Sequence, residues 1–330
     1  MIPDNLHLHP DIFKNDAVPS APTRNGFGEG LVDAGHDDER VVALCADLTE
    51  STRILDFQKA FPDRYIELGV AEQNLATVAS GMAAAGKIPF IASYATFSPG
   101  RNNEQIRTTI ALNNQPVKIV GGHAGLSVGP DGATHQALED MGLMRMLPRM
   151  TVISPCDSEQ ARKATRASID VDGPVYLRLS RAAFPICTTD KTPFEIGKAQ
   201  VMFDTENPEA VIIATGSMVY PSILIAEKMT TQGIAVSVIN IHTIKPLDRE
   251  TITAYAQKAG AVVTCEEHQI AGGLGSAVAE TLSQTHPVPM EYIGVHDQFG
   301  QSGTPDELMH HYGLDEEHIE EAVQKVIGRK

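Results

Sequence analysis

The sequence predicts an α/β protein with two doubly wound domains, each built on a mainly parallel sheet. Its 330 residues are enough for two domains of roughly 100 to 200 residues each. From about residue 40 onward, short apolar runs alternate with helical patterns, as in the βαβ units of a parallel sheet. A polar stretch with prolines, residues 185–209, interrupts this alternation before it restarts. We therefore expect two α/β domains joined by a linker.

The first domain is predicted from five short apolar runs and the helical patterns between them. Because short apolar runs between turn signals are typical of buried strands, we expect strands at 41–46, 89–94, 117–122, 150–155 and 175–180. The intervening patterns predict helices at 71–86, 102–112 and 157–169. Asp157 or Ser158 is available as the N-cap of the last helix.

The second domain repeats this alternation on a smaller scale. Strands are predicted at 210–215, 235–241, 261–266 and 290–295, and helices at 219–232, 248–259, 272–285 and 315–328. The first 20 residues hold three prolines and have no clear period, so we interpret this segment as an extended arm. The predicted organisation is an N-terminal arm at 1–22, a first domain at 23–186, a linker at 187–209 and a second domain at 210–330.

Composition narrows the classes of partner. The chain has 26 Lys plus Arg against 42 Asp plus Glu, a net charge of −16, and no basic stripe. We therefore expect neither nucleic acid nor a membrane surface as partner. The longest apolar stretch, 210–226, contains Pro221 and several polar residues and is shorter than the roughly 20 residues of a membrane span. The N-terminal sequence lacks the pattern of a secretory signal, so a cytoplasmic location is expected.

The four cysteines stand far apart and form no CxxC pair, so they predict neither a disulfide framework nor a zinc site. Glu266, Glu267 and His268 are consecutive, but adjacent residues of a strand point in alternate directions, which argues against a shared metal ion. The sequence therefore offers no metal ligands in this chain.

Polar residues follow several of the predicted strands. Asp47 follows the first strand, Glu72 follows the YIELGV segment, and His123 follows the strand at 117–122. Asp131 and His135 lie in the glycine-rich loop 121–136. Because ligands of open parallel sheets collect at the carboxyl ends of the strands, we expect a site there.

These segments resemble a known family. The motifs ADLTES (46–51), YIELGVAEQN (65–74), SYATF (93–97), GPDGATHQ (129–136) and YLRLSR (176–181) are similar to the pyrimidine-binding half of transketolase. Residues from about 195 to 330, with GGLGSAVAE (272–280) and FGQSGTPDEL (299–308), resemble the transketolase C-terminal domain. The resemblance runs from Arg24 to the end of the chain, and it implies thiamine diphosphate as cofactor.

The resemblance assigns cofactor contacts residue by residue. Glu72 matches the glutamate that hydrogen-bonds a ring nitrogen of the aminopyrimidine, which implies a buried carboxyl that is protonated or shares a proton. Phe97 matches the aromatic side chain that stacks on the pyrimidine, with Tyr94 as a second candidate. Gly100 stands where single-chain transketolases commonly have another aromatic, which predicts a more open pyrimidine pocket. The pair that abuts the cofactor from the strand end is matched by Asp47 and Leu48.

The resemblance also assigns substrate contacts. Contacts to sugar hydroxyls near the reacting carbonyl are matched by His123, Asp131 and His135, and the two histidines can move protons at neutral pH. With Glu72 they are the catalytic candidates. A grip on the sugar's phosphate is matched by Arg24, Ser51 and Arg181. We interpret the neighbouring Arg178 as a member of a surface ion pair.

One motif of the family is missing. Transketolases hold the cofactor's diphosphate and a divalent metal, Mg²⁺ or Ca²⁺, with a GDG motif on a separate domain, and no GDG occurs in this chain. The resemblance therefore implies the C-terminal subunit of a split transketolase, completed by an N-terminal subunit that carries the diphosphate-binding domain and the metal. We expect two copies of this chain and two of the partner, and phosphosugars as substrates of a two-carbon ketol transfer.

Other readings remain open. A 1-deoxyxylulose-5-phosphate synthase and the β subunit of a 2-oxo acid dehydrogenase share both domains. The synthase tends to carry Asp where this chain has His123, and the dehydrogenase subunit should lack the phosphate grip. A non-catalytic assembly subunit is a third alternative, against which the presence of Glu72 speaks. A NAD-dependent dehydrogenase is discounted because no GxGxxG follows the first strand of either domain.

Overall fold

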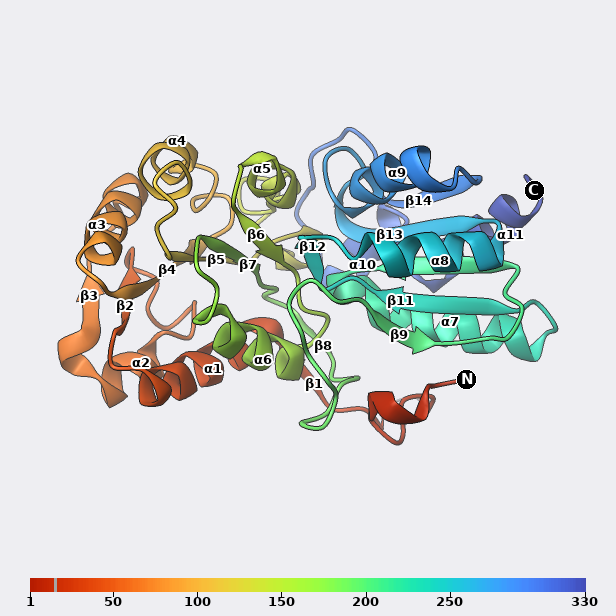
Figure 1. The fold of residues 1–330 in the computed structure, drawn as a ribbon, viewed down its shortest axis with the longest axis horizontal. Coiled ribbons are helices and arrows are strands. Elements are labelled where there is room, and N and C mark those ends of the chain that lie inside the picture. The colour runs from red at the N-terminus through yellow and green to blue at the C-terminus, as the bar shows by residue number, and fades with distance from the viewer. Residues whose placement is uncertain (15–16) are drawn as a thin grey trace.

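The computed structural model describes residues 1–14 and 17–330. They form two α/β halves that lie side by side, and most of the earlier part of the chain lies in one half and most of the later part in the other (Figure 1). The sheet of the first half has seven strands in the order β12-β6-β7-β5-β4-β2-β3. Their bounds are β2 Val41–Cys45, β3 Tyr65–Glu67, β4 Ile88–Tyr94, β5 Lys118–Gly122, β6 Thr151–Ile153, β7 Val175–Arg178 and β12 Thr243–Lys245.

Helices cover both faces of this sheet (Figure 1). One face packs against α1 Thr23–Asp37, α2 Leu55–Ala60 and α6 Ser158–Ser168. The other face packs against α3 Glu72–Ala84, the π-helical segment η3 Ile106–Ala111, which continues the short helix α4 Asn103–Gln105, and α5 Asp140–Met146. The strands β2 to β7 pair in parallel, so their carboxyl ends share one edge of the sheet.

The second half has five strands in the order β14-β13-β10-β11-β9. Their bounds are β9 Gln200–Phe203, β10 Ala210–Ala214, β11 Val236–Asn240, β13 Val262–Gln269 and β14 Met290–Val295. One face carries α7 Val219–Thr231 and α11 Glu316–Ile327, and the other carries α8 Arg249–Ala259 and α9 Leu274–Thr285. The short helix α10 Pro305–His311 begins with a capping box formed by Thr304 and Glu307.

Two strands have partners that the sequence analysis did not predict, and one of them, β12, ties the two halves together. β9 lies inside the predicted linker and pairs antiparallel with β11. β12 follows β11 in the chain but leaves its sheet and pairs antiparallel with β6 of the first sheet. The apolar core beneath α3 and α5 is continuous with the core beneath α8 and α9. One hydrophobic cluster therefore spans both halves.

Every strand and helix predicted from the sequence is present, with bounds that differ by a few residues. Asp157 is the N-cap of α6, because its carboxylate accepts a hydrogen bond from the backbone N–H of Gln160. The longest missed element is α1, whose sequence contains four glycines that obscure its apolar period. A Cβ atom at Gly26 would lie 1.7 Å from the carbonyl oxygen of Ser158, so glycine lets α1 and α6 approach closely.

The N-terminal arm is anchored rather than simply extended. It contains the 3-10 turn η1 Asp4–Leu6, and Leu6, Leu8 and Ile12 are buried in the core of the second half. β1 Ser20–Pro22 then pairs antiparallel with β8 Ala183–Pro185. Within the described ranges 1–14 and 17–330, no helix is long and apolar enough to cross a bilayer.

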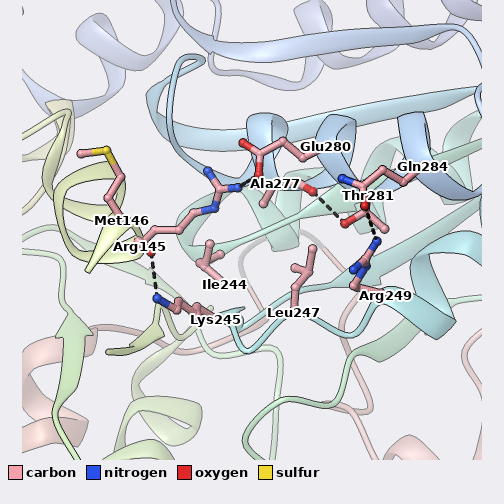
Figure 2. A pocket seen from close by; sticks show the side chains of 10 residues that line it. All are labelled: Arg145, Met146, Ile244, Lys245, Leu247, Arg249, Ala277, Glu280, Thr281 and Gln284. Atoms are coloured by element: carbon pink, nitrogen blue, oxygen red, sulfur yellow. Dashed lines mark hydrogen bonds and ion pairs between the residues drawn. The ribbon is translucent and has the colours of Figure 1, made fainter. Parts of the chain in front are cut away.

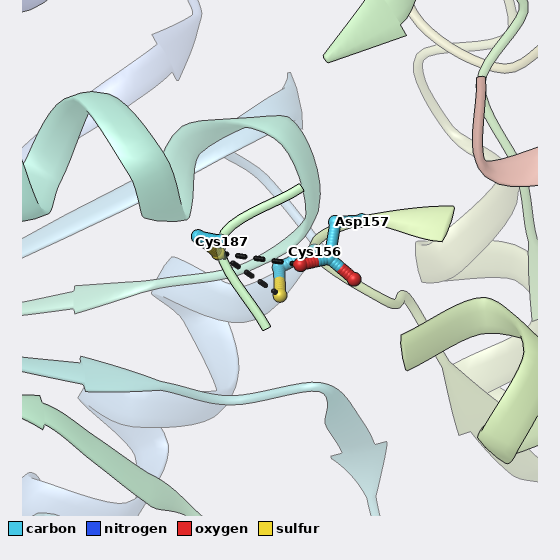
Figure 3. Close-up of side chains that lie close together, drawn as sticks. All are labelled: Cys156, Asp157 and Cys187. Atoms are coloured by element: carbon cyan, nitrogen blue, oxygen red, sulfur yellow. Dashed lines mark hydrogen bonds between the residues drawn. The ribbon is translucent and has the colours of Figure 1, made fainter. Parts of the chain in front are cut away.

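The four cysteines are free thiols, and all are buried. Cys156 and Cys187 lie side by side with their sulfur atoms 3.9 Å apart, next to Asp157 (Figure 3). Burial raises the pKa of Cys156 well above its ordinary value, which keeps it a neutral thiol. Asp157 already accepts hydrogen bonds from Gln160 and Thr188. This cluster stabilises the start of α6.

Candidate functional site

The parallel strands bring the predicted site residues to one edge of the first sheet. Tyr94, the last residue of β4, pairs in register with Gly122 of β5, so His123 emerges beside it. The rings of Tyr94 and His123 lie with their centroids 3.9 Å apart. His135 comes from the glycine-rich loop, and its ring lies 6.1 Å from that of Tyr94 and 5.4 Å from that of Phe97. Strand ends and loop thus converge on one place.

The cationic side of the site centres on Arg24, at the start of α1. Its Nη1 donates to the carbonyl oxygen of Ser51 at 2.9 Å and lies 3.0 Å from Nε2 of His123. Arg181 donates from Nη1 to the carbonyl oxygen of Val128 at 2.8 Å. Burial, followed by repulsion from Arg53 and Arg181, lowers the pKa of Arg24. The site therefore concentrates positive charge within an acidic chain.

His123 is held neutral in this setting. Burial, with the nearby charges of Arg24 and Arg181, lowers the pKa of His123 to about 3. A guanidinium can only donate, so Nε2 of His123 accepts and its proton is assigned to Nδ1. Among the described residues, Nδ1 of His123 and Nε of Arg24 are buried without a hydrogen-bond partner. These two donors suit oxygen atoms of a bound anion or sugar.

Glu72 lies on the other side of Phe97, at the first residue of α3, and its side chain is only 2% exposed. Its Oε2 accepts a hydrogen bond from Nη1 of Arg101 at 2.9 Å. The same guanidinium lies over the ring of Phe97, 4.8 Å from the centroid. Phe97 and Tyr94 are stacked with their centroids 6.1 Å apart. Glu72, Arg101, Phe97 and Tyr94 thus form one continuous row of contacts.

Arg101 makes contacts that bear on two sequence-based expectations in this region. The resemblance implied a buried Glu72 that is protonated or shares a proton; the side chain is buried, and it contacts the guanidinium of Arg101. Gly100 predicted a more open pyrimidine pocket; in the structure the guanidinium of Arg101 lies over the ring of Phe97. Neither Arg101 nor its pairing was predicted, although Arg101 directly follows Gly100 in the sequence.

Three other predicted residues lie apart from these contacts. In the part of the chain that the structure describes, no hydrogen bond or ring contact joins Asp47, Leu48 or Asp131 to the row or to Arg24. Asp47 and Asp131 are exposed, and Leu48 packs against the core beneath α1. Ser51, predicted to contact the substrate's phosphate, accepts a hydrogen bond from Arg24 through its carbonyl oxygen.

The second half of the molecule holds the glycine-rich loop in place. Glu267 on β13 is 3% exposed and accepts hydrogen bonds from the backbone N–H of Ser127 at 2.7 Å and from Oγ of Ser217 at 2.8 Å. A Cβ atom at Gly125, whose φ is +88°, would lie 2.2 Å from Oε1 of Glu267, so the loop needs glycine there. The side-chain amide of Gln136 donates to the backbone of the same loop and to the carbonyl oxygen of Gln301.

Glu266 and Glu267 point in different directions, as the strand pattern predicted. Glu266 accepts hydrogen bonds from the backbone N–H groups of Leu274 and Gly275, at the start of α9. The interpretation of Arg178 as a surface ion pair is wrong. Its side chain is 7% exposed and pairs with the buried Asp140, because β7 is a central strand of the sheet.

The hollow shown in Figure 2 lies elsewhere. This cavity of about 460 Å³ sits between α5 and the helices α8 and α9, and Arg145, Lys245 and Arg249 contribute its positive charge. Among the described residues that line it, none is a predicted site residue. Arg145 pairs with Glu280, and Lys245 donates to backbone carbonyls at the end of α5. The candidate site is thus defined by converging side chains rather than by this cavity.

The chain is similar in sequence to known proteins over most of its length. Residues 20–186 match the family model of the transketolase pyrimidine-binding domain, and residues 197–319 match that of the transketolase C-terminal domain. The chain is 40% identical to a 6-deoxy-6-sulfo-D-fructose transketolase subunit of Clostridium sp. (strain MSTE9), over 93% of this chain and 95% of that protein. It is 37% identical to one of the subunits of the apulose-4-phosphate transketolase of Phocaeicola vulgatus, over 90% of this chain and 94% of that protein.

A solved structure of a split gene transketolase, described as an inactive β4 tetramer, is also similar. It has 42% sequence identity and a TM-score of 0.87, and the match covers 93% of this chain and 98% of that one. The similarity therefore extends over both halves of the fold.

Proposed function

The chain belongs to the transketolase family, and from that premise we propose that it is the C-terminal subunit of a split transketolase that transfers a two-carbon ketol group between sugars. It consists of the family's pyrimidine-binding and C-terminal domains. Relatives of the same length are themselves described as transketolase subunits. The transfer would run from a ketose to an aldose, with thiamine diphosphate as cofactor.

The residues around Phe97 fit the aminopyrimidine of this cofactor. Phe97 offers a flat apolar face, and Glu72 offers a buried carboxyl at hydrogen-bonding distance from a group that lies on that face. When bound, the cofactor supplies a carbon nucleophile and an electron sink for the two-carbon unit. In this proposal Glu72 holds or exchanges the proton of the pyrimidine ring nitrogen, and Phe97 and Tyr94 fix the ring's orientation.

The cationic side of the site fits a substrate with a terminal anion. Arg24 and Arg181 can donate charge-assisted hydrogen bonds, and Arg53 adds positive charge nearby. The unpaired Nδ1–H of His123 lies between this side and Tyr94, where it can donate to a sugar hydroxyl or carbonyl oxygen. His135, beside Phe97, is the candidate for moving a proton during cleavage of the sugar.

The relatives support an anionic substrate and leave its identity open. One is described as acting on 6-deoxy-6-sulfo-D-fructose and another on apulose 4-phosphate. The first carries a sulfonate and the second a phosphate at the end of the sugar chain. We propose a ketose with a terminal phosphate or sulfonate as the donor, with Arg24 and Arg181 as the residues that bind the anion.

The proposal of a partner subunit rests on a motif that the sequence lacks. The chain has no GDG motif for the cofactor's diphosphate, so we propose that an N-terminal subunit holds the diphosphate and its metal. The similar split gene transketolase that is described as an inactive β4 tetramer supports this dependence. We propose an active assembly of two copies of each subunit.

The observation that carries the proposal is the buried carboxyl of Glu72 beside the face of Phe97. Replacing Glu72 by Ala in the assembled enzyme should abolish most turnover while the far-ultraviolet circular dichroism of the subunit stays unchanged. The exposed Glu104, replaced by Ala, is the matched control. Unchanged turnover in Glu72→Ala would reject the proposal.

A further inference from the structure

We infer that Arg101 occupies the aminopyrimidine position in the free subunit, so that the cofactor enters only by displacing the subunit's own guanidinium. The inference rests on the proposed function and adds a control of cofactor entry at the same site. It explains why the pocket that Gly100 was expected to open is covered.

The guanidinium makes the two contacts that the aminopyrimidine is expected to make. It is a flat N–H donor whose Nη1 lies 2.9 Å from Oε2 of Glu72, and its plane centre lies 4.8 Å from the ring centroid of Phe97. Guanidinium groups commonly stack on aromatic faces and donate to carboxylates. A pyrimidine ring that stacks on the same face and hydrogen-bonds the same carboxylate cannot be accommodated while the guanidinium is there.

The local sequence builds this position. The backbone N–H of Arg101 donates to the carbonyl oxygen of Phe97 at 3.0 Å, which turns the chain back over the ring. A Cβ atom at Gly100 would lie 2.1 Å from the carbonyl oxygen of Thr96, so the turn requires glycine. Asn102, which is fully buried, donates from Nδ2 to the carbonyl oxygen of Glu72 at 3.0 Å and to Oγ of Ser98. The turn is thereby fixed against the start of α3.

The guanidinium can leave, but the carboxylate cannot. The side chain of Arg101 is 51% exposed, whereas that of Glu72 is 2% exposed. A half-exposed arginine is readily solvated, and its ion pair and cation–π contact are weakened by water. Together these contacts should reduce cofactor affinity by roughly three- to twentyfold. Contacts from the partner to the diphosphate and metal would supply the energy for this displacement.

The direct test is a calorimetric titration of thiamine diphosphate, with Mg²⁺, into the assembled cofactor-free enzyme. The variant Arg101→Gln should bind the cofactor three- to twentyfold more tightly than the wild type, because nothing then competes for Glu72. Arg101→Lys keeps the charge but loses the flat group, so its affinity for the cofactor should lie between those of the wild type and Arg101→Gln. Arg107→Gln, a change at an exposed arginine in η3, is the matched control and should bind as the wild type does.

The outcomes separate the inference from the proposed function. If the wild-type assembly binds no thiamine diphosphate, the proposed function fails. If the wild type binds it and Arg101→Gln binds it equally well or more weakly, the inference is wrong while the function stands. Weaker binding would make Arg101 a cofactor ligand instead.

A second measurement uses the free subunit alone and needs no cofactor. Urea unfolding of Arg101→Gln, Glu72→Gln and the double variant forms a double-mutant cycle. If the two side chains are paired, the shift in the urea midpoint of the double variant should differ from the sum of the shifts of the two single variants. Additive shifts would show that Arg101 does not pair with Glu72, and the inference would be withdrawn.

Discussion

Replacing Glu267 by Ala tests whether the C-terminal domain holds the glycine-rich loop of the candidate site. The buried carboxylate of Glu267 joins Ser127 of that loop to Ser217 of the second half, at 2.7 and 2.8 Å. Alanine removes both acceptors and leaves the backbone N–H of Ser127 buried without a partner. We therefore expect a loss of stability and a loop that no longer presents His135 correctly.

The magnitude follows from the two hydrogen bonds. Each hydrogen bond to a charged acceptor contributes about 1.5–3 kcal/mol, and removing the buried carboxylate returns part of this because its desolvation cost disappears. The free energy of unfolding should therefore fall by about 2–4 kcal/mol, which corresponds to a fall in Tm of roughly 3–6 °C for a chain of this size.

The assay is thermal unfolding of the subunit, followed by kcat and KM of the assembled enzyme. Glu267→Gln should recover most of the stability, because its amide oxygen can accept from Ser127 and its NH₂ can donate to the Ser217 hydroxyl. Glu206→Ala, at an exposed loop position, is the control. A Tm within about 1 °C of the wild type for Glu267→Ala would refute the reasoning.

Further predictions concern substrate charge and pH. Arg181→Ala should raise KM for a phosphorylated donor by roughly 10- to 100-fold, as expected for a lost charge-assisted hydrogen bond; an equal loss with an unphosphorylated donor would contradict the anion-binding role. Burial and the charges of Arg24 and Arg181 lower the pKa of His123 to about 3, so the NMR signal of its ring should not shift between pH 8 and 5. The signal is assigned by its loss in His123→Asn. A titration midpoint above pH 5.5 would count against this environment. Burial raises the pKa of Glu266 from 4.5 to about 7, so the folded state binds its proton more tightly than the unfolded chain. The stabilisation from this bound proton should be complete below pH 4.5 and disappear as the pH rises through 7. It is measured as the difference in unfolding free energy between wild type and Glu266→Gln at each pH. A difference that does not change over this range would show that the raised pKa is wrong.

The sequence predicted features that depend on local patterns. Apolar runs located the strands, and parallel strands place their carboxyl ends together, so the proximity of Tyr94, His123 and Phe97 followed from motif order. The N-cap signal placed the start of α6 and offered Asp157 or Ser158 as its cap, and Asp157 is the cap in the structure. Helix α1 was missed because its glycines serve close packing on α6 and not helix propensity.

Features that depend on contacts between distant segments were not predictable from one sequence. Glu267 reaches Ser127 across 140 residues, and β12 joins the first sheet after the second has begun. The pair between Arg101 and Glu72 depends on how tightly the turn at Gly100 winds, which no composition or period reveals. Arg178 was misjudged because its burial is set by the central position of β7, a property of sheet order.

The central claim is that this chain carries half of a transketolase active site. The most direct measurement is ketol transfer from a ketose phosphate, such as xylulose 5-phosphate, to ribose 5-phosphate with thiamine diphosphate and Mg²⁺. It is made with this chain alone, with a candidate N-terminal subunit alone, and with the two mixed. The account predicts turnover only in the mixture. Turnover by this chain alone would contradict the half-site, and a stable complex of the two that transfers no ketol group from phosphorylated or sulfonated donors would contradict the assigned reaction.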